Sequence, residues 1–284
     1  MVAASAMTTP PHTETQPPRK TSDLLPRVLS GIVMIGAAVT ALYIGGMLWA
    51  ALITVLAALM CAEWQTITHS GDAPLLSRLI LASAACGCLI VFWVFGPLYA
   101  GIASASLVFG AAICHWLQPS RHWLWSALGL VYVILPAAAL MWLRVQDNPS
   151  GIILVSFLFM AVWATDIGGY FVGRNVGGPK IFPSISPKKT WSGSIGGALL
   201  AAICVVLLKP ALGLQGSYAG LAMAAIVISI VSQLGDAFES ALKRRFGVKD
   251  SGTIIPGHGG VLDRLDGLLF CAPILAVVIW VSRL

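Results

Sequence analysis

The chain has 284 residues, of which 58% are hydrophobic and only 10% are charged, and its mean hydropathy is +0.88. These values exclude an ordinary soluble domain and indicate an integral membrane protein. A net charge of +6 could suggest nucleic-acid binding. In so apolar a chain, the preference of basic residues for the cytoplasmic side of a membrane explains the charge better, so we expect no nucleic-acid partner.

The first 24 residues differ in composition from the rest of the chain. They are rich in Pro, Thr and Ser and contain no apolar stretch, so residues 1–24 are predicted to form a disordered tail. The first apolar run begins near Leu25 and is long enough to span a bilayer, which distinguishes it from a signal peptide.

The remainder divides into apolar runs of the length that one helix needs to cross a bilayer, about 20 residues. The runs are long and do not alternate in polarity, so we expect helices rather than a membrane barrel. The predicted fold is all-α and polytopic, with about nine transmembrane helices. The predicted spans are residues 27–44, 46–63, 77–95, 98–117, 123–143, 150–172, 191–212, 217–238 and 262–282.

The basic residues predict how these spans are oriented. With the N-terminus inside, fourteen of the seventeen Lys and Arg residues fall on the inner side, and only Arg144, Lys209 and Arg283 fall outside. This asymmetry favours an N-in, C-out topology in which both long polar connections, after spans six and eight, are cytoplasmic.

Acidic residues divide the chain into two regions. Six of the eleven lie in the second half: Asp166, Asp236, Glu239, Asp250, Asp263 and Asp266. We therefore predict a transmembrane scaffold over residues 25–145 (spans one to five) and a catalytic transmembrane region over residues 146–284 (spans six to nine with the two polar loops).

Two acidic helical faces flank the second polar connection. Ser232, Asp236, Glu239, Ser240 and Lys243 recur at helical spacing, and so form one polar stripe at the end of span eight. Asp263 and Asp266 are three residues apart, which places both carboxylates on one face at the start of span nine.

Two acidic faces at membrane depth would repel each other and are costly to desolvate. A divalent metal between Asp236 and Asp263 would offset both costs, and Mg²⁺ accepts one or two carboxylates while it keeps waters and substrate phosphates. The alternative is simple pairing of these carboxylates with Lys243, Arg244 or Arg264.

The connection also contains the run Pro256-Gly257-His258-Gly259-Gly260. Its glycines allow the backbone to approach a ligand closely, as phosphate-binding loops do. His258 is a candidate proton carrier or phosphate donor, and the alternative is a structural hydrogen bond that fixes the loop.

A second polar segment, residues 166–197, is rich in Gly and Pro and is predicted to form a structured loop that re-enters the membrane. Within it, Lys188 and Lys189 with neighbouring hydroxyl groups could bind phosphates, or could simply mark a cytoplasmic helix end. Spacing does not decide whether Asp166 is a third metal ligand or a partner at a helix interface.

The pattern SALKRRFGVKDSGTIIPGHGGVLDRLD, residues 240–266, resembles the signature of phosphatidate cytidylyltransferases, also called CDP-diacylglycerol synthases. The upstream run SPKKTWSG, residues 186–193, is similar to a second conserved block of that family. Spans six to nine fall within the resemblance, whereas spans one to five agree only in being hydrophobic.

The resemblance implies that CTP and phosphatidate react to give CDP-diacylglycerol and pyrophosphate on the cytoplasmic side of a membrane, most simply a bacterial inner membrane. It implies a requirement for Mg²⁺, a potassium ion that assists in some members, and homodimers of nine-helix protomers. By similarity, Asp236 and Asp263 are the central metal ligands and Lys243 joins them at the phosphates. Ser192 departs from the family, which usually has Glu at that position.

Together these patterns assign Asp236, Lys243 and Asp263 to catalysis. The predicted substrate-binding residues are Ser186, Lys188, Lys189, Ser240, Arg244, Lys249, Asp250, His258, Gly259, Gly260, Arg264 and Asp266.

Two other functions would also use charged groups in an apolar chain. A CTP-dependent polyprenol kinase would use the same nucleotide in a membrane. An ion or anion path would spread charges through the membrane depth, whereas here they cluster on one side.

Overall fold

A computed structural model describes residues 24–71, 73–117, 123–146, 150–255 and 259–282. The predicted tail (except Leu24) and His258 lie outside these residues. The described part contains nine helices and one β-hairpin: α1 (Leu24–Ile44), α2 (Gly46–Thr68), α3 (Leu75–Phe95), α4 (Pro97–Leu117), α5 (Trp123–Arg144), α6 (Ser150–Val176), β1 (Lys180–Phe182), β2 (Ser186–Thr190), α7 (Trp191–Leu212), α8 (Tyr218–Arg245) and α9 (Leu262–Val281).

The protein is an all-α polytopic membrane protein apart from this hairpin. Seven of the helices, namely α2, α3, α5, α6, α7, α8 and α9, are long and apolar enough to cross a membrane, and Val28–Ile44 forms a shorter apolar helix. Each predicted span corresponds to one helix of the structure. The number of nine crossings and the N-in orientation stay predictions.

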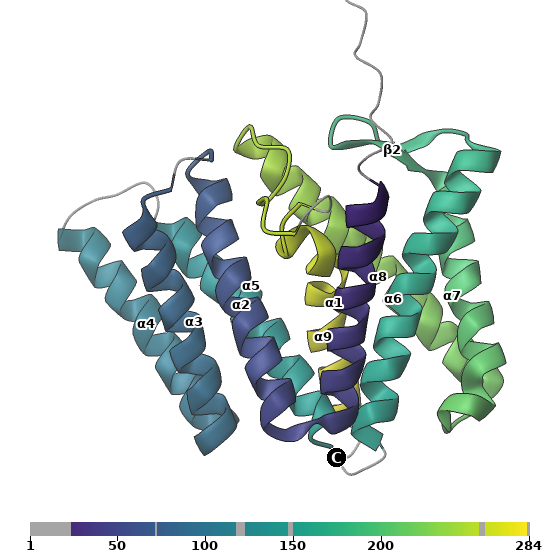
Figure 1. Ribbon diagram of the computed structural model, residues 1–284, viewed down its shortest axis with the longest axis horizontal. Helices are drawn as coiled ribbons and strands as arrows, with labels where there is room; N and C mark the ends of the chain where they lie inside the picture. The colour runs from purple at the N-terminus through teal and green to yellow at the C-terminus, as the bar shows by residue number, and fades with distance from the viewer. Residues whose placement is uncertain (1–23, 72, 118–122, 147–149, 256–258, 283–284) are drawn as a thin grey trace, which may run out of the picture.

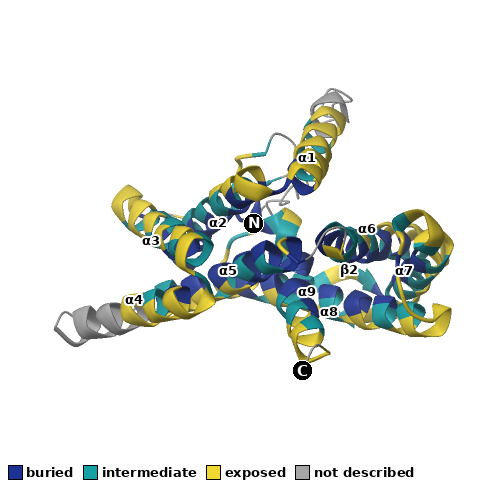
Figure 2. Cartoon of the chain, turned by 90° about the horizontal axis from the view of Figure 1, so that it is seen from below, coloured by how far each residue is buried: buried dark blue, intermediate teal, exposed yellow. Residues whose placement is uncertain are grey.

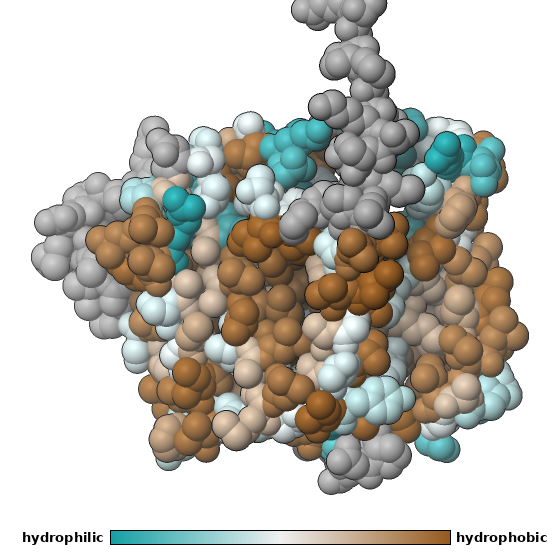
Figure 3. All heavy atoms as spheres, in the orientation of Figure 1, coloured by the Kyte–Doolittle hydropathy of each residue, from teal (hydrophilic) through white to brown (hydrophobic). Residues whose placement is uncertain are grey.

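The helices form a bundle whose two ends differ in character. The hairpin, the start of α1 and the α8–α9 connection lie at one end, and α9 finishes at the other (Figure 1). In space-filling view, hydrophobic residues cover the middle of the visible face and hydrophilic residues collect near both ends (Figure 3). This distribution is that of a protein whose middle faces lipid.

Buried residues concentrate where α2, α5, α6, α8 and α9 meet, while α3, α4 and α7 turn exposed faces outward (Figure 2). Tryptophan N–H groups join α2 to α5 within this core. Trp49 Nε1 donates to the Leu140 carbonyl at 3.2 Å and Trp64 Nε1 to that of Trp125 at 2.7 Å. Each bond satisfies the polar atom of a side chain whose ring is otherwise buried in apolar surroundings.

A tight break at Gly45 and Gly46 separates α1 from α2. Gly45 and Gly46 both have left-handed φ values, +68° and +53°, which residues with a Cβ rarely adopt. Arg144 at the end of α5 donates from Nε to the Leu42 carbonyl at 2.6 Å and thereby satisfies the C-terminal end of α1.

Glycines allow α6 and α7 to pack closely. A Cβ on Gly168 would lie 2.9 Å from the Gly197 Cα, and one on Gly197 would lie 2.6 Å from the Thr165 carbonyl oxygen. Small residues at such positions are typical of membrane helix interfaces because they bring the backbones together.

The segment over residues 166–197 differs from its prediction. Instead of a structured loop that re-enters the membrane, α6 continues to Val176, an antiparallel hairpin pairs β1 with β2, and α7 begins at Trp191. Thr190 caps α7, because its hydroxyl accepts a hydrogen bond from the Gly193 N–H at 3.1 Å. The Ser192 hydroxyl donates to the Gly177 carbonyl, so this residue closes the base of the hairpin.

Candidate functional site

The polar stripe of α8, the start of α9 and the hairpin meet at one end of the bundle (Figure 1). Helix α8 is 28 residues long, which corresponds to about 42 Å at 1.5 Å per residue. A hydrocarbon core is only about 30 Å thick. The polar last turns of α8 can therefore extend beyond the apolar layer.

Asp263 accepts hydrogen bonds from three donors. Lys243 Nζ lies 2.6 Å from its Oδ1, and the backbone N–H groups of Ser251 and Gly260 donate to its Oδ2 at 3.0 and 2.9 Å. A Cβ on Gly259 would lie 2.8 Å from the same Oδ2. The backbone at Gly259 therefore lies against the Asp263 carboxylate, and its approach to a ligand stays a prediction.

Asp236 is held more loosely. Its side chain is 38% exposed and forms an ion pair with Lys189, whose Nζ lies 2.5 Å from Oδ2. The Ser240 hydroxyl, one turn along α8, donates to Oδ1 at 3.4 Å. Lys189 comes from β2, so the hairpin supplies a cation directly to the polar stripe of α8.

Glu239 and Asp266 lie between these two carboxylates. Glu239 is 1% exposed, and both of its carboxylate oxygens are buried without a hydrogen-bond partner among the described residues. Its one ion pair joins Oε1 to Lys243 Nζ at 3.3 Å. Asp266 Oδ1 accepts a hydrogen bond from the Gly267 N–H at 2.8 Å, and its carboxyl group interacts with that of Glu239.

These contacts define the acidic cluster, which comprises Asp236, Glu239, Asp263 and Asp266. Four carboxylates face the two ammonium groups of Lys189 and Lys243. Asp166 of α6 adds a further carboxylate, which interacts electrostatically with Asp266, Asp236 and Arg264. The carboxylates therefore outnumber the lysine ammonium groups that contact them.

The side chains of the acidic cluster can supply only some of the ligands that a divalent cation needs. Among the described residues, no three His, Cys, Asp or Glu side chains converge closely enough to hold a metal by themselves. The buried Glu239 oxygens without donors, and the excess of carboxylates, nevertheless fit a cation. Mg²⁺ suits such a set because it takes one or two carboxylates and completes its coordination with water and phosphate oxygens.

The alternative of simple pairing is met in part. Asp263 is paired with Lys243, which is one of the three partners that this alternative named. Asp236 is paired with Lys189 of β2 rather than with a basic residue of α8 or α9. Both ion pairs come from lysines, whose flexible stems allow the ammonium group to move from a carboxylate to a bound phosphate.

Other predicted substrate-binding residues lie around the acidic cluster. Lys188 is exposed on β2, next to the half-buried Ser186, and Arg244 is exposed on α8 with its Nε 3.5 Å from the Ile185 carbonyl oxygen. Arg264 lies on the exposed side of α9. Lys188, Arg244 and Arg264 therefore present cationic side chains at the hairpin and at the ends of α8 and α9.

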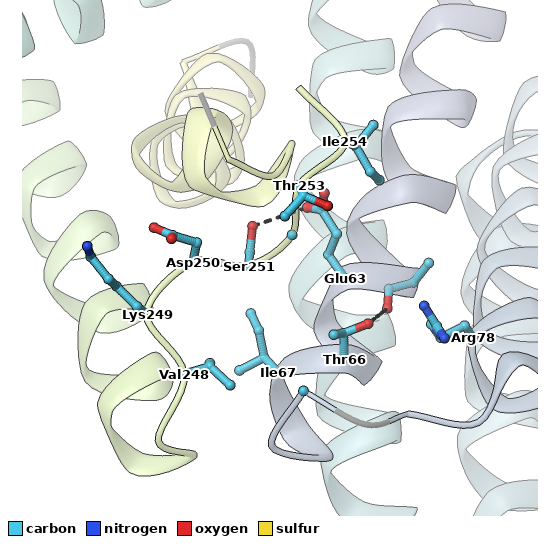
Figure 4. A pocket seen from close by; sticks show the side chains of 13 residues that line it. Glu63, Thr66, Ile67, Arg78, Val248, Lys249, Asp250, Ser251, Thr253 and Ile254 are labelled. Carbon is cyan, nitrogen blue, oxygen red and sulfur yellow. Dashed lines mark hydrogen bonds between the residues drawn. The ribbon is translucent and has the colours of Figure 1, made fainter. Parts of the chain in front are cut away.

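Lys249 and Asp250 instead line a cavity of about 520 Å³ on the other side of the connecting segment (Figure 4). The end of α2 and Arg78 of α3 form its opposite wall. The lining of this cavity includes neither Lys189 nor Asp236, with which the sequence grouped these two residues.

Glu63 of α2 is the polar residue of this region that the sequence reasoning missed. It is 3% exposed and accepts hydrogen bonds from the backbone of the segment that leads into α9. Its partner Val261 is 198 residues away in the chain, so no local spacing relates them. One signal was available, because an ionisable residue inside an apolar span is a functional candidate by default.

Comparison with known proteins agrees with the motifs. The model of the cytidylyltransferase family matches residues 25–282. Relatives named phosphatidate cytidylyltransferase include one from Brucella suis, 48% identical over 169 residues, which are 60% of this chain and 62% of that protein. One from Rickettsia bellii is 32% identical over 263 residues, 90% of this chain and 91% of the relative. One from Bacillus subtilis is 43% identical over 125 residues, 44% and 46% of the two chains.

The match to the Brucella suis relative thus spans 62% of that protein's length, whereas the Rickettsia match spans nearly all of both chains. The family match extends from the first turn of α1 to the end of α9 and includes every residue of the acidic cluster. The chain therefore belongs to the cytidylyltransferase family.

Proposed function

We propose that the protein is a phosphatidate cytidylyltransferase. A phosphate oxygen of phosphatidate attacks the α-phosphorus of CTP and forms a new P–O bond. The bond from the α-phosphorus to the oxygen that bridges it to the β-phosphorus breaks, and pyrophosphate leaves with the electron pair. The observation that carries this proposal is the meeting of the acidic cluster with Lys189 and Lys243 at the polar end of an apolar bundle.

Both substrates are anions, so the main barrier to their meeting is electrostatic. Lys189 and Lys243 would neutralise phosphate oxygens, and positioning together with charge stabilisation supplies most of what such a transfer needs. Asp236 and Asp263 would hold Mg²⁺, which supplies charge neutralisation at the reacting phosphates. The backbone N–H groups of Ser251 and Gly260 hold Asp263 in place for that role.

The site lies at the end of the bundle, where the apolar middle gives way to hydrophilic residues (Figure 3). A lipid phosphate could enter there from the side while its acyl chains stay in hydrocarbon, and CTP would arrive from water. We propose that this end faces the cytoplasm of a bacterial inner membrane and that the protein is a homodimer, as the family resemblance implies. The proposal includes a potassium ion that assists Mg²⁺.

Two labelled forms of CTP test the reaction. Purified protein in detergent is incubated with phosphatidate, Mg²⁺ and CTP labelled on either the α- or the γ-phosphorus. The proposal requires that the α-label enters the lipid fraction and that the γ-label leaves as pyrophosphate. Transfer of the γ-label to a polyprenol offered in parallel, with no α-label in lipid, would instead identify a kinase.

Removal of divalent ions tests the metal. With EDTA present we expect lipid labelling to fall to background and to return when Mg²⁺ is added in excess, because Lys189 and Lys243 alone do not neutralise the carboxylates together with the phosphates of both substrates. Replacing K⁺ by Na⁺ at constant Mg²⁺ tests the second cation. Undiminished labelling in EDTA would contradict the metal assignment.

A further inference from the structure

Glu63 lies on α2, in the part of the chain predicted to be scaffold, yet it contacts the segment that ends at the acidic cluster. Its Oε1 accepts the Val261 N–H at 2.9 Å, and its Oε2 accepts the Leu262 N–H at 2.8 Å and the Ser251 hydroxyl at 3.3 Å. Figure 4 shows Glu63 and Ser251 near each other among the side chains that line the cavity. Three donors from one connecting segment therefore converge on a single carboxylate.

This carboxylate takes the place of a helix cap. Val261 precedes the first turn of α9. Its apolar side chain cannot accept hydrogen bonds from the free N–H groups of that turn. Those groups need an acceptor, and a negative charge at a helix N-terminus is stabilised by the helix dipole. Within the described residues no Lys or Arg forms an ion pair with Glu63, so the backbone donors offset its burial.

Glu63 and Asp263 both accept hydrogen bonds from the same segment. Ser251 donates its N–H to Asp263 and its hydroxyl to Glu63. Gly260 donates to Asp263, and the next residue, Val261, donates to Glu63. Any displacement of the segment away from Glu63 thus displaces donors that fix the Asp263 carboxylate.

Two glycines show how closely the segment is pressed against Glu63. A Cβ on Gly252 would lie 2.9 Å from Glu63 Oε1, and a Cβ on Gly260 would lie 2.7 Å from it. Only residues without a Cβ allow this approach, so the glycine content of the connection serves the contact with Glu63 as well as the contact with Asp263.

We propose that Glu63 is a positioning residue: through Val261, Leu262 and Ser251 it fixes the start of α9, and thereby orients Asp263 for reaction. This role rests on the proposed cytidylyl transfer. It assigns to a helix of the predicted scaffold a direct part in building the site. Glu63 itself touches neither substrate nor metal in this proposal.

Hydrogen exchange and kinetics of the full-length protein test the proposal together. Glu63→Gln keeps the size of the side chain but replaces one acceptor oxygen with an NH₂ group that opposes a backbone N–H. We expect faster amide exchange in residues 251–255 and 259–262, and a kcat lowered by roughly 10- to 100-fold, the range found when a group that orients a ligand is lost. The KM for CTP should change by less than about threefold, because the substitution leaves the groups that bind CTP in the ground state in place.

Gln65→Ala is the matched control. Gln65 lies two residues away on α2, is also 3% exposed, and bonds to Ser126 of α5 rather than to the segment. This variant should lose stability without faster exchange in residues 251–255 and 259–262 and without loss of kcat per folded molecule. Should Glu63→Gln not fold, Ser251→Ala removes only the hydroxyl bond to Glu63 and should shift exchange and kcat in the same direction by less.

Unchanged exchange in Glu63→Gln, or faster exchange with a wild-type kcat, would overturn the proposal. If the wild-type protein transfers no nucleotide to phosphatidate, the proposed function fails. The exchange measurement still decides separately whether Glu63 holds the segment.

Discussion

Asp236 and Asp263 are carboxylates at the same end of the bundle, but the chain holds them in different ways. Asp263 is bonded by Lys243 and two backbone N–H groups and is almost fully buried. Asp236 is partly exposed and relies on Lys189 and one hydroxyl. Asp263 is therefore a fixed point of the site, whereas Asp236 can exchange its lysine for another cation at little cost.

The first prediction concerns Asp263. Asp263→Asn removes the charge that Lys243 and a metal would share, and its NH₂ group would oppose a backbone N–H. We expect cytidylyl transfer to fall by at least about 100-fold. Unfolding stability should fall by about 1–3 kcal/mol, because Lys243 keeps Glu239 as a partner. Labelled-CTP assays and thermal unfolding in detergent measure the two effects, and normal turnover would remove Asp263 from the site.

The second prediction separates two adjacent lysines. Lys189 contacts Asp236, whereas Lys188 is exposed on the same strand. Lys189→Ala should lower kcat/KM more than Lys188→Ala does, by about tenfold or more, since one charge-assisted contact to a phosphate contributes about 1.5–3 kcal/mol. The free energy of unfolding of either variant should fall by no more than about 1 kcal/mol, because ion pairs that are partly exposed to solvent contribute little to stability. Equal effects of the two substitutions would contradict the assignment of Lys189.

At the scale of elements, an apolar run and the helix that contains it end at different residues. The apolar run of span eight stops near residue 238, but α8 continues to Arg245. Hydrogen bonds along a helix do not depend on apolar side chains, so the helix carries Glu239 and Lys243 beyond the predicted span. The sequence located the spans because a bilayer demands apolar runs of a certain length. It did not locate the hairpin, because Gly and Pro mark a break in a helix without specifying what replaces it.

The third prediction concerns the interface between α6 and α7, which places the hairpin and hence Lys189. Gly197→Ala would bring a Cβ to 2.6 Å from the Thr165 carbonyl oxygen. We expect a loss of about 1–3 kcal/mol in unfolding free energy, because a close backbone contact cannot relax. Gly87→Ala is the control: it lies within α3 with no atom within 4 Å of its Cβ, and should be neutral or stabilising by about 0.5–1 kcal/mol. Thermal unfolding of both variants in the same detergent compares their stabilities. Equal stability would show that the interface between α6 and α7 can accommodate a Cβ at position 197.

At the scale of the whole molecule, the site depends on both predicted regions. The charge pattern assigned chemistry to residues 146–284, and the acidic cluster does lie there. Glu63, however, belongs to the apolar first half and reaches the start of α9 by tertiary packing alone. Contacts between residues 198 positions apart leave no trace in local spacing, so the sequence located the polar stripes but not the residue that joins them to the scaffold.

The fourth prediction concerns orientation, which decides whether the site meets cytoplasmic CTP. The turn of the hairpin and the connection between α7 and α8 lie at opposite ends of α7, and each offers an exposed residue, Ser184 and Gln215. Because basic residues gather at the hairpin end, Ser184→Cys should react with a membrane-impermeant thiol reagent only in inverted vesicles, and Gln215→Cys only in spheroplasts. The unsubstituted protein is the control, since its cysteines lie in apolar stretches. Labelling of Ser184→Cys in spheroplasts would place the site on the outer face and exclude a cytoplasmic nucleotide as its substrate.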